Sequence, residues 1–131
     1  MSEHHVVEIE LDDEEALVQA LEEMGYKVEV HANGASVQGY GSSRWGTAHV
    51  ICRKQANRLS ADFGFERVGA TYKLHLDSMD RRRLDQKRLT QLHAKHKVAN
   101  AVKKSPSKYK LASQDVDSNG NIRMKIKVRT Y

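Results

Sequence analysis

Residues 7–25, VEIELDDEEALVQALEEMG, predict a strand followed at once by a helix. Apolar residues alternate with glutamates over 7–11, which is typical of a strand with one buried face. Asp12 is then the expected N-cap, and Glu15 completes a capping box three residues later. Leucine, alanine and methionine recur at spacings of three and four until Gly25, where we expect the helix to end.

The remaining pattern indicates short strands and a second helix. Asn33-Gly34 between two extended runs is a strong hairpin signal. The second helix is expected to begin between Asp80 and Leu84, and Ser105-Pro106 must end it. The expected strands cover 27–32, 35–40, 47–53, 60–66, 71–76, 109–116 and 122–130, with a glycine-rich loop over 39–46. The order β-α-β-β-β-β-β-α-β-β predicts an α+β fold, with two helices on one face of a mostly antiparallel sheet.

The composition suits one domain spanning residues 1–131. The chain has 131 residues, of which 39% are hydrophobic, and this is close to the commonest domain size. No apolar run approaches the roughly 18 residues that a membrane span needs. Because Cys52 is the only cysteine, no internal disulfide can form, and a reducing compartment such as the cytoplasm is expected. We therefore expect a soluble cytoplasmic protein with no membrane partner.

Charge is distributed unevenly along the chain. Residues 1–26 hold nine acids and no Lys or Arg, whereas residues 80–131 hold fifteen bases and four acids. The formal net charge of +5 therefore combines an acidic beginning with a strongly basic second half. A basic segment of this kind favours an anionic partner such as nucleic acid.

The last predicted strand carries a row of cations. Because they alternate with apolar residues, they fall on one face about 6.6 Å apart, close to the phosphate spacing along one nucleic-acid strand. These cations are Arg123, Lys125, Lys127 and Arg129. The face suits a polyanion. Alternatively, the row lies beside the first strand and makes ordinary cross-strand pairs with Glu8 and Glu10.

A second basic group lies near the start of the second helix. Its members are Arg81, Arg82, Arg83, Lys87 and Arg88. Each cation at a helix N-terminus interacts unfavourably with the helix dipole, at a cost of about 0.3 to 1 kcal/mol, so these residues do not stabilise the helix. Either the helix begins after the arginines, or they contact an anionic partner, or the run is simply a solvated face. With Lys95, Lys97, Lys103, Lys104 and Lys108 they are expected to form one long basic side.

The third candidate is the segment around the only tryptophan. Trp45, with Tyr40 and Arg44 nearby, has the residue types of a base-stacking or protein-contact site. Alternatively, the indole packs across the sheet. The Gly-x-Gly pattern here lacks the third glycine of a dinucleotide-binding loop, so no cofactor is expected.

The histidines are the fourth candidate. His93 and His96 lie three residues apart on the second helix, with His49 or His75 as conceivable third metal ligands. The apolar stripe of the helix runs through Leu89 and includes His96, so we expect His96 to be a core histidine and no metal to bind.

Nothing in the sequence points to catalysis, and no catalytic residue is predicted. There is no nucleophile elbow, P-loop or paired-carboxylate signature. Asp62 and Asp77 fit turn-capping roles. A deep polar pocket around His49, His75 and His96 would instead indicate an enzyme.

Short motifs spread over nearly the whole chain carry a family resemblance. They are Gly39-Tyr40, Asp62-Phe63-Gly64-Phe65, Gly69, Tyr72, Leu74, Asp77, His96-Lys97-Val98, Gly120, Ile122 and Arg123. The chain resembles the family called hypothetical chloroplast reading frame thirty-five, a domain of unknown function in plastids, cyanobacteria, other bacteria and some phages. The resemblance implies a shared fold and no established activity.

Together these features predict a small non-catalytic protein whose basic second half binds nucleic acid through backbone phosphates. Such binding is only weakly sequence-specific, because cations in a row position a backbone without reading bases. The alternative is a protein-interaction module, such as an adaptor, an inhibitor or a virion component. It would dock an acidic protein partner through the Trp45 segment or through the charged faces.

Overall fold

The computed structural model describes residues 4–39, 44–81, 83–105, 109–116 and 122–128, with the backbone alone for Glu8 and for the strands after residue 105. The elements follow the chain as β1 (His4–Ile9), α1 (Glu14–Glu23), β2 (Glu29–Gln38), β3 (Arg44–Cys52), α2 (Lys54–Asn57), β4 (Phe63–Val68), β5 (Thr71–Asp77), α3 (Gln86–Lys104), β6 (Tyr109–Val116) and β7 (Ile122–Val128).

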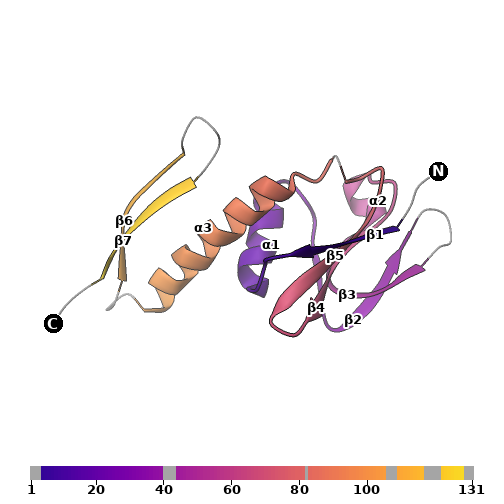
Figure 1. The fold of residues 1–131 in the computed structure, drawn as a ribbon, viewed down its shortest axis with the longest axis horizontal. Coiled ribbons are helices and arrows are strands. Elements are labelled where there is room, and N and C mark those ends of the chain that lie inside the picture. The colour runs from indigo at the N-terminus through magenta and orange to yellow at the C-terminus, as the bar shows by residue number, and fades with distance from the viewer. Residues whose placement is uncertain (1–3, 40–43, 82, 106–108, 117–121, 129–131) are drawn as a thin grey trace.

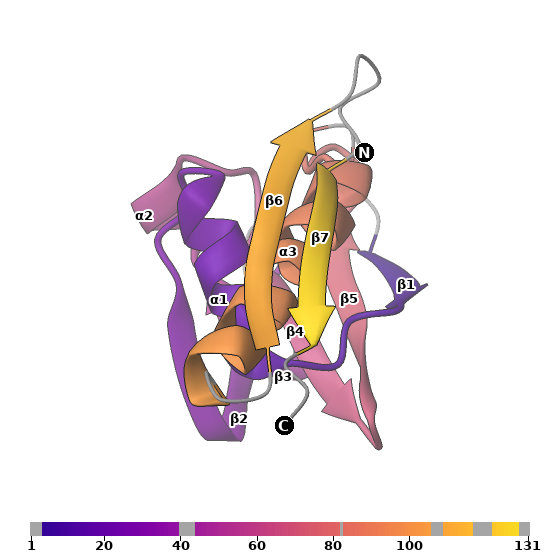
Figure 2. The same cartoon turned by 90° about the vertical axis from the view of Figure 1, so that its left-hand side faces the viewer.

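These elements form three layers (Figures 1 and 2). The first is a five-stranded sheet in the order β1-β5-β4-β3-β2, in which every neighbouring pair is antiparallel. Helices α1 and α3 lie together on one face of it. The β6–β7 pair contacts α3 on the side away from the sheet. The predicted α+β class and the antiparallel sheet with two helices on one face are confirmed.

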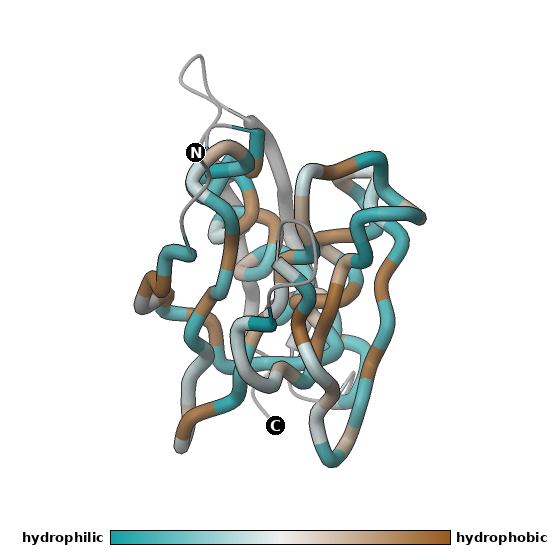
Figure 3. Tube along the Cα trace, turned by 90° about the vertical axis from the view of Figure 1, so that its right-hand side faces the viewer, coloured by the Kyte–Doolittle hydropathy of each residue, from teal (hydrophilic) through white to brown (hydrophobic). Residues whose placement is uncertain are grey.

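The main core lies between the helices and the sheet. Hydrophobic and hydrophilic residues alternate along the strands, as Figure 3 shows. The buried set of strand residues packs with residues of α1 and α3 in one core. Burying each large apolar side chain contributes about 1.5 to 3 kcal/mol. The sheet supplies mainly Val50, Cys52, Phe63, Phe65, Tyr72, Leu74 and Leu76, and the helices supply Leu17, Ala20, Leu21, Leu89 and Leu92.

Helix α1 forms as its sequence predicts, with its start shifted by one residue. Asp13, rather than Asp12, is the N-cap, and its side chain accepts a hydrogen bond from the backbone N–H of Ala16 at 2.9 Å. The carboxylate of Asp12 instead binds Lys97 of α3. The helix ends where expected, because Gly25 adopts a φ of 95° directly after the C-cap.

The predicted hairpin at Asn33-Gly34 is wrong, because β2 continues through it. In the pairing with β3, Val30 lies opposite Val50, yet Ala35 lies opposite Ala48, so residues 31–34 bulge out opposite a single residue of β3. Gly34 has a φ of 81°, and a Cβ there would collide with the Thr47 side chain. The glycine therefore permits close approach within a sheet rather than a reversal of the chain.

The glycine-rich segment before β3 is shorter than predicted, since β3 already begins at Arg44. A short helix, α2, was also not predicted, and Asp62 holds it in place. Oδ1 of Asp62 accepts from the backbone N–H of Lys54 at 2.8 Å, and Oδ2 accepts from Gln38 N–H and from Arg53 Nη1, both at 2.9 Å. Asp62 therefore joins the end of β2 to the start of α2 and does not cap its own turn, whereas Asp77 does, since its Oδ1 accepts from the backbone N–H of Met79 at 2.8 Å.

Candidate nucleic-acid interface

Of the predicted arginine run, Arg81 and Arg83 lie in a turn that precedes helix α3. Backbone bonds from Asp80 and Arg81 to the Asp77 carbonyl, at 2.9 and 3.1 Å, shape this turn. The helix begins only at Gln86, where the Asp85 side chain accepts from the backbone N–H of Arg88 at 3.0 Å. The prediction of a start between Asp80 and Leu84 is therefore wrong, and the arginines do not oppose the helix dipole.

Four described cations at this end of the molecule form what we call the basic cluster: Arg81, Arg83, Lys87 and Arg88. All four are exposed. Arg83 Nη1 lies 3.6 Å from the buried Asp80 carboxylate, and Arg81 Nη1 lies 3.4 Å from the His5 ring. Within the described part of the chain, Arg81, Lys87 and Arg88 have no carboxylate within ion-pair distance. Arg82 lies outside the described residues.

Three of the four lysines further along α3 pair with carboxylates of α1 or of the residues just before it, so the expectation of one long basic side is wrong. Lys95 Nζ lies 2.9 Å from Glu23, Lys97 Nζ lies 2.8 Å from Asp12, and Lys104 Nζ lies 3.1 Å from Glu15. These contacts, with His96 as a further donor to Glu23, lower the pKa of the Asp12 and Glu23 carboxyls. Of these four lysines only Lys103 has no described ion pair, so most of the unpaired charge of α3 lies at its beginning. Lys108 lies outside the described residues.

The cation row of the last strand does not lie beside the first strand. Strand β7 pairs with β6, and β1 pairs with β5, where Glu8 is opposite Lys73. The alternative of cross-strand pairs with Glu8 and Glu10 is therefore excluded. In the β6–β7 register, Arg123 lies opposite Asp115, Lys125 opposite Ser113 and Lys127 opposite Lys110. Arg129 lies outside the described residues.

Trp45 is half-buried and packs against the sheet, as the structural interpretation predicted. Its indole contacts a small second core of Val37, Ala48 and Ile51. A Cβ added to Gly39 would collide with the indole. The ring also stacks on the His4 imidazole, with centroids 4.8 Å apart and an interplanar angle of 3°. Of its predicted neighbours, Arg44 is exposed, and Tyr40 lies outside the described residues.

The buried histidine of α3 is His93, so the prediction that His96 faces the core is wrong. His93 Nε2 accepts from the backbone N–H of Asp13 at 3.2 Å, and burial lowers its pKa. His96 instead binds Glu23 at 3.0 Å at the α1–α3 boundary. Both positions fit the spacing of Leu89 and Leu92, so the periodicity alone did not separate them. The described residues contain no group of three His, Cys, Asp or Glu arranged to hold a metal ion.

Sequence reasoning missed a chain of polar contacts across three neighbouring strands. His4 Nε2 lies 2.9 Å from His75 Nδ1, and His75 Nε2 lies 3.0 Å from Glu66 Oε1. The three residues come from β1, β5 and β4, which are adjacent in the sheet. Their proximity follows only from the strand order, so no local motif could have signalled it.

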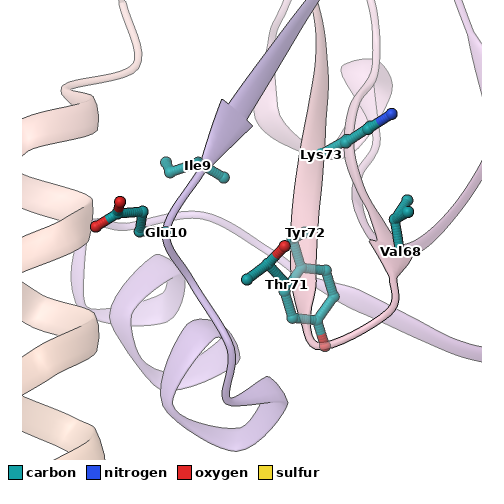
Figure 4. Close-up of a pocket in the computed structure, with 6 residues that line it drawn as sticks. All are labelled: Ile9, Glu10, Val68, Thr71, Tyr72 and Lys73. Atoms are coloured by element: carbon teal, nitrogen blue, oxygen red, sulfur yellow. The ribbon is translucent and has the colours of Figure 1, made fainter.

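The histidines do not meet in an enzyme-like pocket. His49 accepts from the backbone N–H of Arg67, His75 contacts Glu66, and His96 contacts Glu23 of α1. A cavity of about 520 Å³ lies instead where β1 ends, beside the β4–β5 turn (Figure 4). Its lining is Ile9, Glu10, Val68, Thr71, Tyr72 and Lys73. The Cys52 thiol is buried in the core, which raises its pKa and keeps it protonated.

The fold and this surface define a small α+β protein with a basic end. Residues 20–125 match the family described as Protein of unknown function (DUF1257), so the chain belongs to that family. The earlier resemblance was likewise to a domain of unknown function. No curated protein and no solved structure matches the chain. Among the described helices, none has the length and apolar character needed to cross a membrane.

Proposed function

We propose that this protein binds nucleic acid through backbone phosphates, with contacts centred on the turn before α3. The observation that carries the proposal is the contrast along α3. Three of the four lysines in its second half pair with Asp12 or with carboxylates of α1, whereas Arg81, Lys87 and Arg88 lack such partners in the described structure. The contacting residues are Arg81, Arg82, Arg83, Lys87 and Arg88, extended by Arg123, Lys125, Lys127 and Arg129 of the last strand.

The chemistry of these groups suits phosphate. Arginine presents a planar fork of donors that matches phosphate oxygens, and exposed cations release condensed counterions when they bind a nucleic-acid backbone. The proposed contacts read no base edge, so the expected affinity depends weakly on sequence and strongly on salt.

An acidic protein partner is the other candidate for the same charges. The Trp45 segment supports it less, because the indole ring already packs against the second core and His4. If a protein partner docks there, Trp45→Ala abolishes its capture and leaves any nucleic-acid retention unchanged.

Fluorescence anisotropy with labelled single-stranded and duplex oligonucleotides at about 50 mM salt tests the proposal. The decisive variant is Arg81→Gln/Arg82→Gln/Arg83→Gln. The matched control is Lys95→Gln/Lys97→Gln/Lys104→Gln, which also removes three positive charges but takes them from residues that α1 already neutralises. We expect the arginine variant to lose at least about tenfold in affinity and the lysine variant clearly less. Equal losses, or no binding by the wild type, would refute the proposal.

A further inference from the structure

The face of the five-stranded sheet that is turned away from α1 and α3, here called the outer face, carries the polar chain of His4, His75 and Glu66. Trp45 of β3 reaches His4 of β1 although β5 and β4 lie between these strands in the sheet. The missing side chain of Gly64 allows this. A Cβ there would lie 2.7 Å from Ala48 Cβ and 3.0 Å from Val37 Cγ2, so β2 and β3 fold over the outer face at that point.

The contacts fix where the protons lie. A carboxylate only accepts, so Glu66 requires the hydrogen of His75 on Nε2. In a neutral His75 ring, Nδ1 is then an acceptor, and it receives the Nε2–H of His4 at 2.9 Å. His4 is exposed, and no described residue hydrogen-bonds to its Nδ1. The first proton that these three residues take up from solvent therefore binds to His4 Nδ1.

The hydrogen bonds that join His4, His75 and Glu66 can accommodate one added proton but not two. After protonation at His4 Nδ1, both hydrogen bonds persist, because His4 Nε2 still donates to His75 Nδ1. A second proton must go to His75 Nδ1. Two N–H donors then face each other across 2.9 Å, and both rings carry a positive charge. The side-chain contact between His4 and His75 cannot survive that state.

We propose that His4, His75 and Glu66 form a pH-sensitive clasp that holds the N-terminal end of β1 over Trp45 and opens when both histidines are protonated. Opening separates the His4 imidazole from the indole, since the ring moves with its strand. The clasp exposes one face of Trp45 in acid and covers it at neutral pH. This device is independent of the proposed nucleic-acid binding.

The charged groups around the clasp set its working range. His5 neighbours His4 and is in contact with Arg81, whereas Asp77 lies opposite His4 in the β1–β5 register. The Asp77 carboxylate is fully buried, and its Oδ2 has no hydrogen-bond partner, so it favours positive charge nearby. Lys73 lies opposite Glu66 in the β4–β5 register.

The pKa of His4 is lowered, mainly by burial and further by the nearby His75 and His5. Because the open state binds more protons, acid favours opening, and the clasp is closed above the ordinary histidine range.

The test uses the emission of Trp45, the only tryptophan, in the full chain between pH 8 and 4.5. Far-ultraviolet circular dichroism and amide hydrogen exchange of β1 are measured in parallel. We expect an emission transition with a midpoint below about pH 6.5 and an unchanged dichroism spectrum. Over the same range the protection factors of the β1 amides, which correct for the slower intrinsic exchange in acid, should fall.

Two variants make the test specific to the clasp. In His75→Gln the amide oxygen accepts from His4 and cannot be protonated, so the β1 exchange transition moves down by at least about one pH unit or disappears. His49→Gln removes a histidine outside the clasp from the same strand as Trp45 and keeps the wild-type midpoint. The proposal is overturned if wild-type emission and β1 exchange stay flat, if both variants behave alike, or if the transition coincides with loss of the dichroism signal.

Discussion

Lys97 Nζ of helix α3 donates to both carboxylate oxygens of Asp12, at 2.9 and 2.8 Å, across a sequence separation of 85 residues. This contact joins the acidic beginning of the chain to its basic second half. It also explains why Asp12 does not cap helix α1, since its carboxylate is turned toward α3. The cations of the basic cluster, which lie before α3 and in its first turn, have no such contact with the acidic beginning of the chain in the described structure.

The Asp12–Lys97 pair yields a prediction about acid titration. Replacing Lys97 with methionine should raise the pKa of Asp12, because the Lys97 hydrogen bond is the largest cause of its lowering. A carboxyl whose pKa is lowered by folding stabilises the fold above its ordinary pKa and loses that contribution as the pH falls. Both side chains are about half exposed, so the effect on unfolding free energy should be below about 1 kcal/mol. NMR titration of the Asp12 carboxyl carbon measures the shift. The same change in Lys103→Met, which has no described ion pair, would contradict the assignment.

His93 should make stability depend on pH between about 7 and 5. Burial lowers its pKa, and its Nε2 must stay unprotonated to accept from Asp13. The unfolded chain therefore binds more protons, and unfolding free energy falls as the pH drops below about 6.5, by at most about 1.4 kcal/mol per pH unit for this group.

In His93→Gln the amide oxygen can still accept from Asp13, and it does not titrate. We expect a shallower fall in unfolding free energy from pH 7 to 5, measured by urea unfolding at each pH. Slopes that match between wild type and variant would show that His93 is not the group responsible.

The Asp62 carboxylate should contribute far more to the free energy of unfolding than Glu29, the exposed carboxylate that contacts the same arginine, Arg53. Asp62→Asn leaves Gln38 N–H, Lys54 N–H and Arg53 facing an amide, and should cost about 2 to 4 kcal/mol. Glu29→Gln weakens two exposed contacts, to Arg53 at 3.1 Å and to His31 at 2.9 Å, and should cost about 1 kcal/mol or less. Chemical unfolding measures the free energy lost in each variant. Similar losses in both would mean that Asp62 does not hold α2 in place.

The sequence predicted those features that depend on local chemistry. Alternation and capping gave the fold class and both ends of α1 to within about one residue, because caps and apolar spacing act over a few residues. The hairpin predicted at Asn33-Gly34 was wrong, because this dipeptide occurs both in turns and in bulges. Only the pairing with β3 determines which of the two forms. His96 and His93 share one helical stripe, and the choice between them depends on where α1 lies.

The candidate site was predictable in part. The basic residues were evident from composition, but the neutralisation of Lys95, Lys97 and Lys104 depends on the packing of α1 against α3. The His4–His75–Glu66 chain depends on the strand order, which no short motif encodes.

The salt dependence of nucleic-acid binding is the decisive measurement of whether the basic cluster contacts phosphates. Log affinity should fall linearly with log salt concentration, and each phosphate contact adds about 0.9 to the magnitude of the slope for a duplex. Arg81→Gln/Arg82→Gln/Arg83→Gln should flatten the slope by about two to three, whereas Lys95→Gln/Lys97→Gln/Lys104→Gln should leave it nearly unchanged. Undetectable binding at about 50 mM salt, or equal slopes in the wild type and the arginine variant, would contradict the account.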